Sequence, residues 1–393
     1  MNLNSVKSIL TLRYDYTQTP ILPKLTWRDL ENKENFSSNT IYEKLISNLK
    51  NQIPFDYSGP ISISLSAGVD SSLMLCLLKH CFPNNEINAL SIKFSDSFDE
   101  TEAASKIAKK VGVDHHVIEI DNFLKKLPEA ISITKLPFWD IHWIYVIENA
   151  KRFSNYLISG DGGDELFGGY IFRYSNFLSK IHPNSSINEK INAYLSCHER
   201  DYVSEQDQIF EKKIEFNWED IYEKLSPFFD NTLSPLEQVF LADYNGKLLY
   251  NFSIVNNTIA NNFDVQSITP LLSPEIIQKS MKISSNQKYD SSSNVGKLPL
   301  WEILKTFQID DLVLKQKQGF SVNTNNLWNN YGLSMANSYL SDAKIVQDGW
   351  IKKDWIQSNL NDQNIDVRHI NKLLGLLAFE IWYRKFQKPE SIF

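Results

Sequence analysis

Two short stretches hold the residues that could do chemistry. SAGVDS, at residues 66–71, combines small residues with two hydroxyl groups and one carboxylate, Asp70. LISGDGGDELFGGY, at residues 157–170, carries Asp161 and Asp164 on a glycine-rich turn. Small residues let a backbone approach a phosphate closely, and an acid beside a phosphate requires a bridging divalent cation. The two stretches together predict a phosphate site with Mg²⁺.

The first stretch lies between a strand and a helix. Residues 61–66 alternate like a strand, and residues 71–80 read as a helix that opens directly from the loop. Unpaired N–H groups and the positive end of the helix dipole attract an anion to such a point. The stretch lacks the second glycine and the Lys-Ser/Thr ending of a Walker P-loop. We therefore expect a phosphate loop of another kind.

The first half of the chain alternates between strand and helix patterns. Strand-like runs at 87–94, 115–120 and 155–159 follow the first strand, and helical patterns separate them at 71–80, 98–112, 122–131 and 137–153. This alternation predicts an α/β fold with a doubly wound parallel sheet. Ligands bind at the carboxyl ends of the strands in such a sheet, so both stretches should face one crevice.

The second half of the chain is predicted to be mainly helical. The clearest helices are at 234–252, 273–283 and 369–386, whereas the polar stretches 182–191 and 289–297 read as loops. We expect residues 1–55 to form a segment that packs on the core, 56–180 to form the α/β core and 181–393 to complete the same domain.

Composition limits the kind of partner. The 393 residues are 42% hydrophobic and 22% charged, with a net charge of −7, which argues against nucleic acid or a membrane as the main partner. With neither a signal peptide nor a membrane-spanning run, a cytoplasmic protein is expected. Cys76, Cys81 and Cys197 lack metal-ligand spacing and are expected to be buried free thiols.

Four motifs in order resemble one known family. SAGVDS resembles the S-G-G-x-D-S loop of the ATP-pyrophosphatases, and SGDGGDELFGGY is similar, nearly letter for letter, to the second signature of the class B asparagine synthetases. Residues 99–116 resemble the segment between these signatures, KQKQGF at 315–320 its K-Q-G-F stretch, and 376–386 its closing helix. The match is to the synthetase domain and spans almost the whole chain. Relatives of this family include the β-lactam synthetases and the lasso peptide cyclases.

The resemblance implies a fold, a reaction and cofactors. The fold would be that of the adenine nucleotide α-hydrolases, and the reaction would form an amide through an acyl-adenylate, converting ATP to AMP and pyrophosphate. Ser66, Gly68 and Ser71 would hold the pyrophosphate, and Asp70 and Asp164 would hold Mg²⁺.

Further roles follow from the same resemblance. Lys317 would neutralise charge on the leaving group, and Asp161 would lie near the reacting acyl carbon as a candidate proton acceptor. The residues expected to line the adenosine are Leu65, Ile92, Ser159 and Gly160.

Each candidate also has a purely structural interpretation. Asp70 and Ser71 could cap a helix, Lys317 could be a solvated loop lysine, and Asp164 and Glu165 could favour the first turn of a helix. The combined pattern favours function for the two loops and for Lys317. Structural roles are expected instead for His115 and His116 and for the aromatic residues Phe138, Trp139, Trp143 and Tyr145.

The sequence also departs from the family pattern. We do not expect the family's glutaminase domain with its N-terminal cysteine here, because the phosphate loop comes about sixty residues into the sequence. The acidic D-E-P segment is replaced by KLPF at 135–138, and the K-V-D-R-x-S-M-A region by IVNNTIAN at 254–261. Loss of these charges weakens aspartate as the substrate. Ala67 replaces a glycine and would be strained if its φ were positive.

We therefore expect an amide ligase that uses ATP and Mg²⁺. Its carboxylate would belong to a specialised metabolite or a peptide, and its nitrogen would come from an amine, from ammonia or from a separate nitrogen-donating or carrier partner. One alternative is an ammonia-dependent asparagine synthetase. Another is a catalytically silent scaffold or regulatory homologue, against which the presence of Asp70, Asp164 and Lys317 argues.

Overall fold

The fold is built on one parallel sheet. The computed structural model describes residues 1–34, 37–94, 99–198, 202–315 and 322–387. Its strands have the order β3-β2-β1-β4-β5 and are β1 (Ile61–Ser64), β2 (Ile87–Phe94), β3 (Asp114–Ile120), β4 (Tyr156–Ile158) and β5 (Gln266–Ile268). All four pairings are parallel. The predicted doubly wound α/β fold is confirmed.

The strand order reverses between β1 and β4. The chain passes from β1 outward to β3 and then returns to place β4 on the other side of β1, where Ile63 is in register with Ile158. The loops after these two strands begin at neighbouring carboxyl ends, which is the usual ligand-binding position of an open parallel sheet. The two predicted motifs follow β1 and β4.

Helices fill most of the remaining chain. Those before β5 are α1 (Leu3–Leu12), α2 (Arg28–Glu31), α3 (Ser38–Gln52), α4 (Val69–Cys81), α5 (Thr101–Val111), η1 (Phe123–Lys126), α6 (Leu127–Thr134), α7 (His142–Ala150), α8 (Gly163–Phe167), α9 (Ile171–Lys180), α10 (Ile187–Ser196), η2 (Gln206–Gln208), α11 (Trp218–Phe229), α12 (Pro235–Asp243), η3 (Tyr244–Phe252) and α13 (Ser253–Asn262). Those after β5 are η4 (Pro270–Leu272), α14 (Pro274–Met281), α15 (Ser285–Lys288), α16 (Leu298–Lys305), α17 (Thr324–Leu327), η5 (Trp328–Gly332), α18 (Leu333–Leu340), α19 (Lys344–Gln347), α20 (Lys353–Leu360) and α21 (Val367–Phe386).

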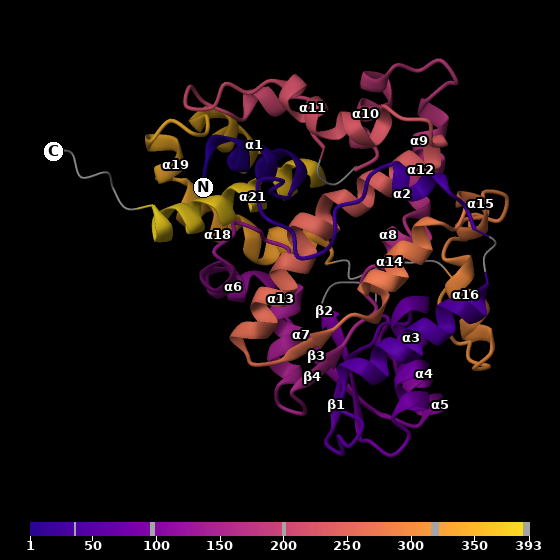
Figure 1. The fold of residues 1–393 in the computed structure, drawn as a ribbon. Helices are drawn as coiled ribbons and strands as arrows, with labels where there is room; N and C mark the ends of the chain where they lie inside the picture. The colour runs from indigo at the N-terminus through magenta and orange to yellow at the C-terminus, as the bar shows by residue number, and fades with distance from the viewer. Residues whose placement is uncertain (35–36, 95–98, 199–201, 316–321, 388–393) are drawn as a thin grey trace.

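Helices cover both faces of the sheet (Figure 1). Ile63 and Ile158 join the hydrophobic cluster of α3, α4 and α5, whereas Leu90 and Leu157 join that of α6, α7 and α13. Successive strand residues point to opposite faces, so a strand buried on both sides is apolar throughout.

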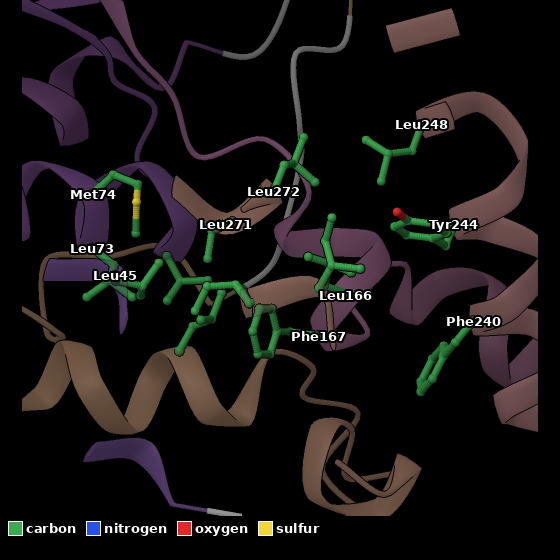
Figure 2. Packing of buried hydrophobic residues seen from close by; sticks show 14 of the residues in the cluster. Leu45, Leu73, Met74, Leu166, Phe167, Phe240, Tyr244, Leu248, Leu271 and Leu272 are labelled. Atoms are coloured by element: carbon green, nitrogen blue, oxygen red, sulfur yellow. The ribbon is translucent and has the colours of Figure 1, made fainter. Parts of the chain in front are cut away.

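The first cluster extends beyond the sheet into the helical half. Figure 2 shows buried side chains from α3 and α4 in line with those of α8, α12 and η3, among them Leu45, Leu73, Leu166, Phe167, Phe240 and Tyr244. Leu166 and Phe167, within the second motif, are fully buried and anchor α8. This packing fixes the acidic motif against both halves of the molecule.

Two local predictions are wrong. The stretch 182–191 was predicted to be a loop, but Ser186 and Glu189 form a capping box that starts α10. The stretch 234–252 was predicted to be one helix, but Gly246 has non-helical angles (φ −97°, ψ −117°) and breaks it inside η3. The strand β5 was not predicted, since two of its three residues, Gln266 and Ser267, are polar and form no apolar run.

No helix in the described part of the chain has both the length and the apolar character that a membrane crossing requires. Gly112 ends α5 in the left-handed conformation, with φ 76°.

Candidate functional site

The loop between β1 and α4 is closed by hydrogen bonds of its own serines. Ser66 N–H donates to Ser71 Oγ at 3.0 Å, and Gly68 N–H donates to Ser66 Oγ at 3.2 Å. Gly68 is the N-cap of α4, and no side chain caps this helix start. The interpretation of Asp70 and Ser71 as an N-cap pair is therefore wrong. An uncapped helix start beside small residues is a suitable binding place for phosphate.

Ala67 fits this loop without backbone strain. Ala67 is not one of the described non-glycine residues that have positive φ. Its backbone is therefore not in the left-handed conformation in which a methyl group would be strained. Its carbonyl accepts a hydrogen bond of 2.9 Å from Leu314 N–H, which ties the loop to the segment that precedes the K-Q-G-F motif.

The acidic loop after β4 lies directly against the phosphate loop. A Cβ on Gly160 would lie 2.8 Å from the carbonyl carbon of Asp70, and one on Gly163 would lie 2.4 Å from its carboxyl carbon. Gly162, between them, has φ 90° and caps α8. Only residues without a side chain permit this approach, so the glycines of the motif set the distance between the two loops.

Lys297 joins the acids of the two loops. Its ammonium group lies 2.5 Å from Asp70 Oδ2 and 2.7 Å from Asp164 Oδ1. The side chain is only 8% exposed, and the residue has φ 58° at the N-cap of α16. A lysine in the left-handed backbone conformation costs about 1 kcal/mol or more of conformational free energy, and it persists only where the surrounding structure imposes it. The sequence offered no signal for Lys297, which ended a stretch predicted to be a loop.

The two loops and Lys297 line one cavity of about 280 Å³. It lies beyond the carboxyl ends of β1 and β4 and is closed by residues of α7, η3, α13 and α16. The predicted site residues that line it are Ser66, Gly68, Asp70, Ser71, Gly160, Asp161 and Asp164.

Three predicted site residues do not line the cavity, and a fourth lies outside the described residues. Leu65 and Ser159 are buried immediately after β1 and β4, and Ile92 lies in β2 opposite Ile118. None of these three is among the described residues that line the cavity. Lys317 lies outside the described residues, although its neighbour Lys315 lines the cavity.

Acidic groups outnumber basic ones in this cavity. Its described lining contains five acids, namely Asp70, Glu100, Asp161, Asp164 and Glu165, and two lysines, Lys297 and Lys315. A triphosphate would be repelled from such a lining unless a cation accompanied it.

The residues present fit Mg²⁺. Asp70 and Asp164 lie close enough to share one lysine ammonium group, and Asp70 Oδ1 is buried with no hydrogen-bond partner in the described chain. Within the described residues no three acid, histidine or cysteine side chains gather as a metal site. Phosphate oxygens and water would complete the octahedral shell of the ion, as is common for Mg²⁺.

Asp161 is held by a residue that the sequence did not predict to have a site role. Asn256 Nδ2, on α13, donates to Asp161 Oδ2 at 3.1 Å, and both residues line the cavity. His142, on α7, lines it as well, and burial lowers the pKa of His142 to about 4. The imidazole is therefore uncharged at neutral pH.

A buried polar cluster adjoins the cavity. Tyr170 O–H donates to Glu165 at 2.5 Å, while Arg173 Nη1 and Tyr194 O–H donate to Asp243 Oδ1 at 2.9 and 3.0 Å. Burial raises the pKa of Glu165 to about 7. Glu165 and Tyr170 line both the main cavity and a second one of about 50 Å³.

The histidines and the aromatic stripe have mostly the structural roles expected of them. His115 and His116 of β3 contact Ser91 and Asn88 of β2, each at 2.8 Å. Phe138, Trp139, Trp143 and Tyr145 are buried in the second cluster. Trp143 differs from the prediction because it also lines the cavity.

The asparagine synthase family model matches residues 49–384, which include both loops, Lys297 and all five strands. The chain belongs to the asparagine synthase family. The resemblance inferred from the motifs is thus confirmed.

Two curated proteins and one solved structure resemble this family member at low sequence identity. It is 22% identical, over 90% of its length, to the glutamine-hydrolysing asparagine synthetase 1 of Bacillus subtilis, and it spans 60% of the length of that relative. It is 25% identical, over half of its length, to 67% of the NH₃-dependent NAD⁺ synthetase of Staphylothermus marinus. A solved NH₃-dependent NAD synthetase from Campylobacter jejuni is 19% identical over 34% of this chain and 61% of that one, with a TM-score of 0.27.

Proposed function

We propose that this chain joins a carboxylate to an amine or ammonia, using ATP and passing through an acyl-adenylate. The supporting observation is that one cavity brings the uncapped start of α4, the pair Asp70 and Asp164, and Asp161 together. A site that splits ATP between its α- and β-phosphates needs an anion cradle, fixed positive charge and room for an acyl group beside them.

In the first step a carboxylate oxygen attacks the α-phosphorus of ATP. The bond from that phosphorus to the bridging oxygen breaks, and pyrophosphate leaves. Ser66, Gly68 and Ser71 would hold the departing phosphates through N–H and O–H groups. Lys297, and Lys317 by its motif, would neutralise the charge that develops on them.

Asp70 and Asp164 would hold Mg²⁺ at the same phosphates. The ion would supply charge neutralisation at the oxygens of the leaving pyrophosphate. Lys297 lies between the two acids, and its ammonium group holds their carboxylates together. When the nucleotide enters with Mg²⁺, this ammonium group would share the two carboxylates with the ion or move away from them. Leu65, Ile92, Ser159 and Gly160 remain our proposed contacts for the adenosine.

In the second step the amine nitrogen attacks the acyl carbon. The bond from that carbon to the AMP oxygen breaks, and the nitrogen loses a proton. Asp161 is the proposed acceptor of the proton, because it lines the cavity and Asn256 fixes one of its oxygens. A general base in that position typically increases the reaction rate by about 10²–10⁴-fold.

The proposed carboxylate belongs to a specialised metabolite or a peptide. An ammonia-dependent asparagine synthetase is the second candidate, since the Bacillus relative is named a glutamine-hydrolysing asparagine synthetase and this chain spans 60% of its length. A silent scaffold is disfavoured because Asp70 and Asp164 line one cavity beside a helix start that no side chain caps, and packing alone does not need that arrangement. We further propose that the protein acts in the cytoplasm and that a separate nitrogen-donating or carrier partner can supply the amine.

The test is the fate of ATP. The protein is incubated with ATP, Mg²⁺, an amine or ammonia and a panel of carboxylates, and the nucleotides are separated by chromatography. AMP and pyrophosphate in equal amounts, formed only with certain carboxylates, are expected. ADP as the stoichiometric product, with no AMP, would rule out the adenylate.

A further inference from the structure

One wall of the cavity has a different chemistry from the rest. The acyl wall, as we call it, consists of His142 and Trp143 of α7, Leu248 and Phe252 of η3, and Asn256 of α13. It adjoins Asp161 through the hydrogen bond from Asn256. In the proposed function the phosphate groups of the nucleotide lie at Ser66, Gly68 and Lys297, which line the same cavity from other elements.

The acyl wall carries no charge at neutral pH. Trp143 and Leu248 are 6% and 2% exposed, and Asn256 is a neutral amide. Burial keeps the His142 ring unprotonated. Both lysines among the described lining residues lie elsewhere: Lys297 is bound to Asp70 and Asp164, and Lys315 follows the segment that Leu314 fixes to the phosphate loop.

We propose that the activated acid carries an uncharged, apolar or aromatic acyl group that packs on the acyl wall, with Asn256 as the residue that determines specificity. This inference rests on the proposed function and names its substrate class. A second carboxylate on the acyl group would be desolvated beside Trp143 and Phe252, where the acyl wall has no cation among its described residues to pair with it, and Asp161 would repel it. Aromatic and branched acyl groups would instead bury apolar surface there.

The test compares acids of similar size with and without a second charge. Carboxylate-dependent exchange of labelled pyrophosphate into ATP is measured with 3-phenylpropanoate and 4-methylpentanoate, and with glutarate and aspartate. We expect kcat/KM for the apolar acids to exceed that for the charged ones by about 100-fold or more. A preference for glutarate or aspartate would overturn the inference while leaving the adenylate intact.

Two variants probe the acyl wall directly. Asn256→Arg places a cation on it and should reduce the preference for the apolar acids by about tenfold or more. The control is Asn257→Arg, which adds the same charge at the adjacent, exposed position of α13 outside the cavity. Equal preferences in the two variants would contradict the role of Asn256.

Binding without turnover separates this inference from the proposed function. Ligand-observed NMR of 3-phenylpropanoate should show binding to the wild-type chain and weaker binding to Phe252→Ala, whose side chain is only half-buried. If 3-phenylpropanoate binds but no acid yields AMP, the proposed function is overturned and the acyl wall is supported. Absence of binding by both apolar acids at millimolar concentration would overturn the acyl wall.

Discussion

The ammonium group of Lys297 lies 2.5 Å from a carboxylate oxygen of Asp70, although 227 residues separate them in the sequence. The same ammonium group lies 2.7 Å from Asp164. One buried lysine thus pairs with the single acid of the phosphate loop and with the second acid of the acidic loop. The contact joins α16 to both motifs and defines the charge at the centre of the site.

Replacing Lys297 by methionine should destabilise the protein. The change leaves two mostly buried carboxylates without their shared cation, which typically costs about 3 kcal/mol. Chemical unfolding monitored by circular dichroism measures the loss. Adding Asp70→Asn to Lys297→Met should restore part of it, since one of the two repelling charges is then absent. A double variant less stable than Lys297→Met alone would contradict the charge argument.

Asp70→Asn and Asp164→Asn should each lower turnover by about 10²-fold or more, because each removes charge needed at the pyrophosphate. Initial rates of pyrophosphate release with an accepted carboxylate measure the effect. Asp230→Asn, a change at the exposed end of α11, is the matched control and should leave the rate unchanged. Near-normal rates in both site variants would show that the two loops do not share one cation.

Asp161→Asn should separate the two steps of the reaction. The neutral amide can still accept the hydrogen bond from Asn256, but it cannot take a proton from the attacking amine. Exchange of pyrophosphate into ATP should therefore persist, while amide formation falls by about 10²–10⁴-fold. If both steps fell by the same factor, Asp161 would act in adenylation or in folding instead.

Glu165→Gln should flatten the pH dependence of stability. Burial raises the pKa of Glu165 from 4.5 to about 7, so between these pH values the native state binds more protons than the unfolded state. Wild-type stability therefore falls as pH rises through this window, by roughly 3 kcal/mol at most from this group. Because glutamine does not ionise, the stability of the variant should not fall in this way as pH rises.

The measurement is the free energy of unfolding at several pH values from 4 to 8. The difference between Glu165→Gln and wild type should grow in favour of the variant as pH increases. Glu223→Gln, at an exposed position of α11, should follow the wild type. A difference independent of pH would mean that Glu165 does not titrate in this window.

This 393-residue chain should not hydrolyse glutamine by itself. Cys76 and Cys197 are buried and Cys81 is half-buried, and burial raises the pKa of Cys76 to about 12 and also that of Cys81. A nucleophilic cysteine needs an accessible thiolate. Release of glutamate from glutamine is the assay, and replacing all three cysteines by serine should spare amide formation apart from packing losses. Glutaminase activity that one cysteine change abolishes would contradict this.

The sequence by itself determined the fold class and the two loops of the site. Strand and helix periods are local, so the alternation over residues 61–159 predicted the parallel sheet. The topology of such a sheet then required the loops after β1 and β4 to meet. The motifs also identified the family, because their spacing and order are properties of the chain alone.

Only the tertiary structure decided which residues from other elements surround those loops. Lys297 and Asn256 reach the site from α16 and α13, and no local pattern marks a residue whose partner is distant in the sequence. The desolvation that raises the pKa of Glu165 depends likewise on the packing of α8 against helices far along the chain. Charge pairing and burial are properties of the folded neighbourhood, and they emerge only when separate elements pack together.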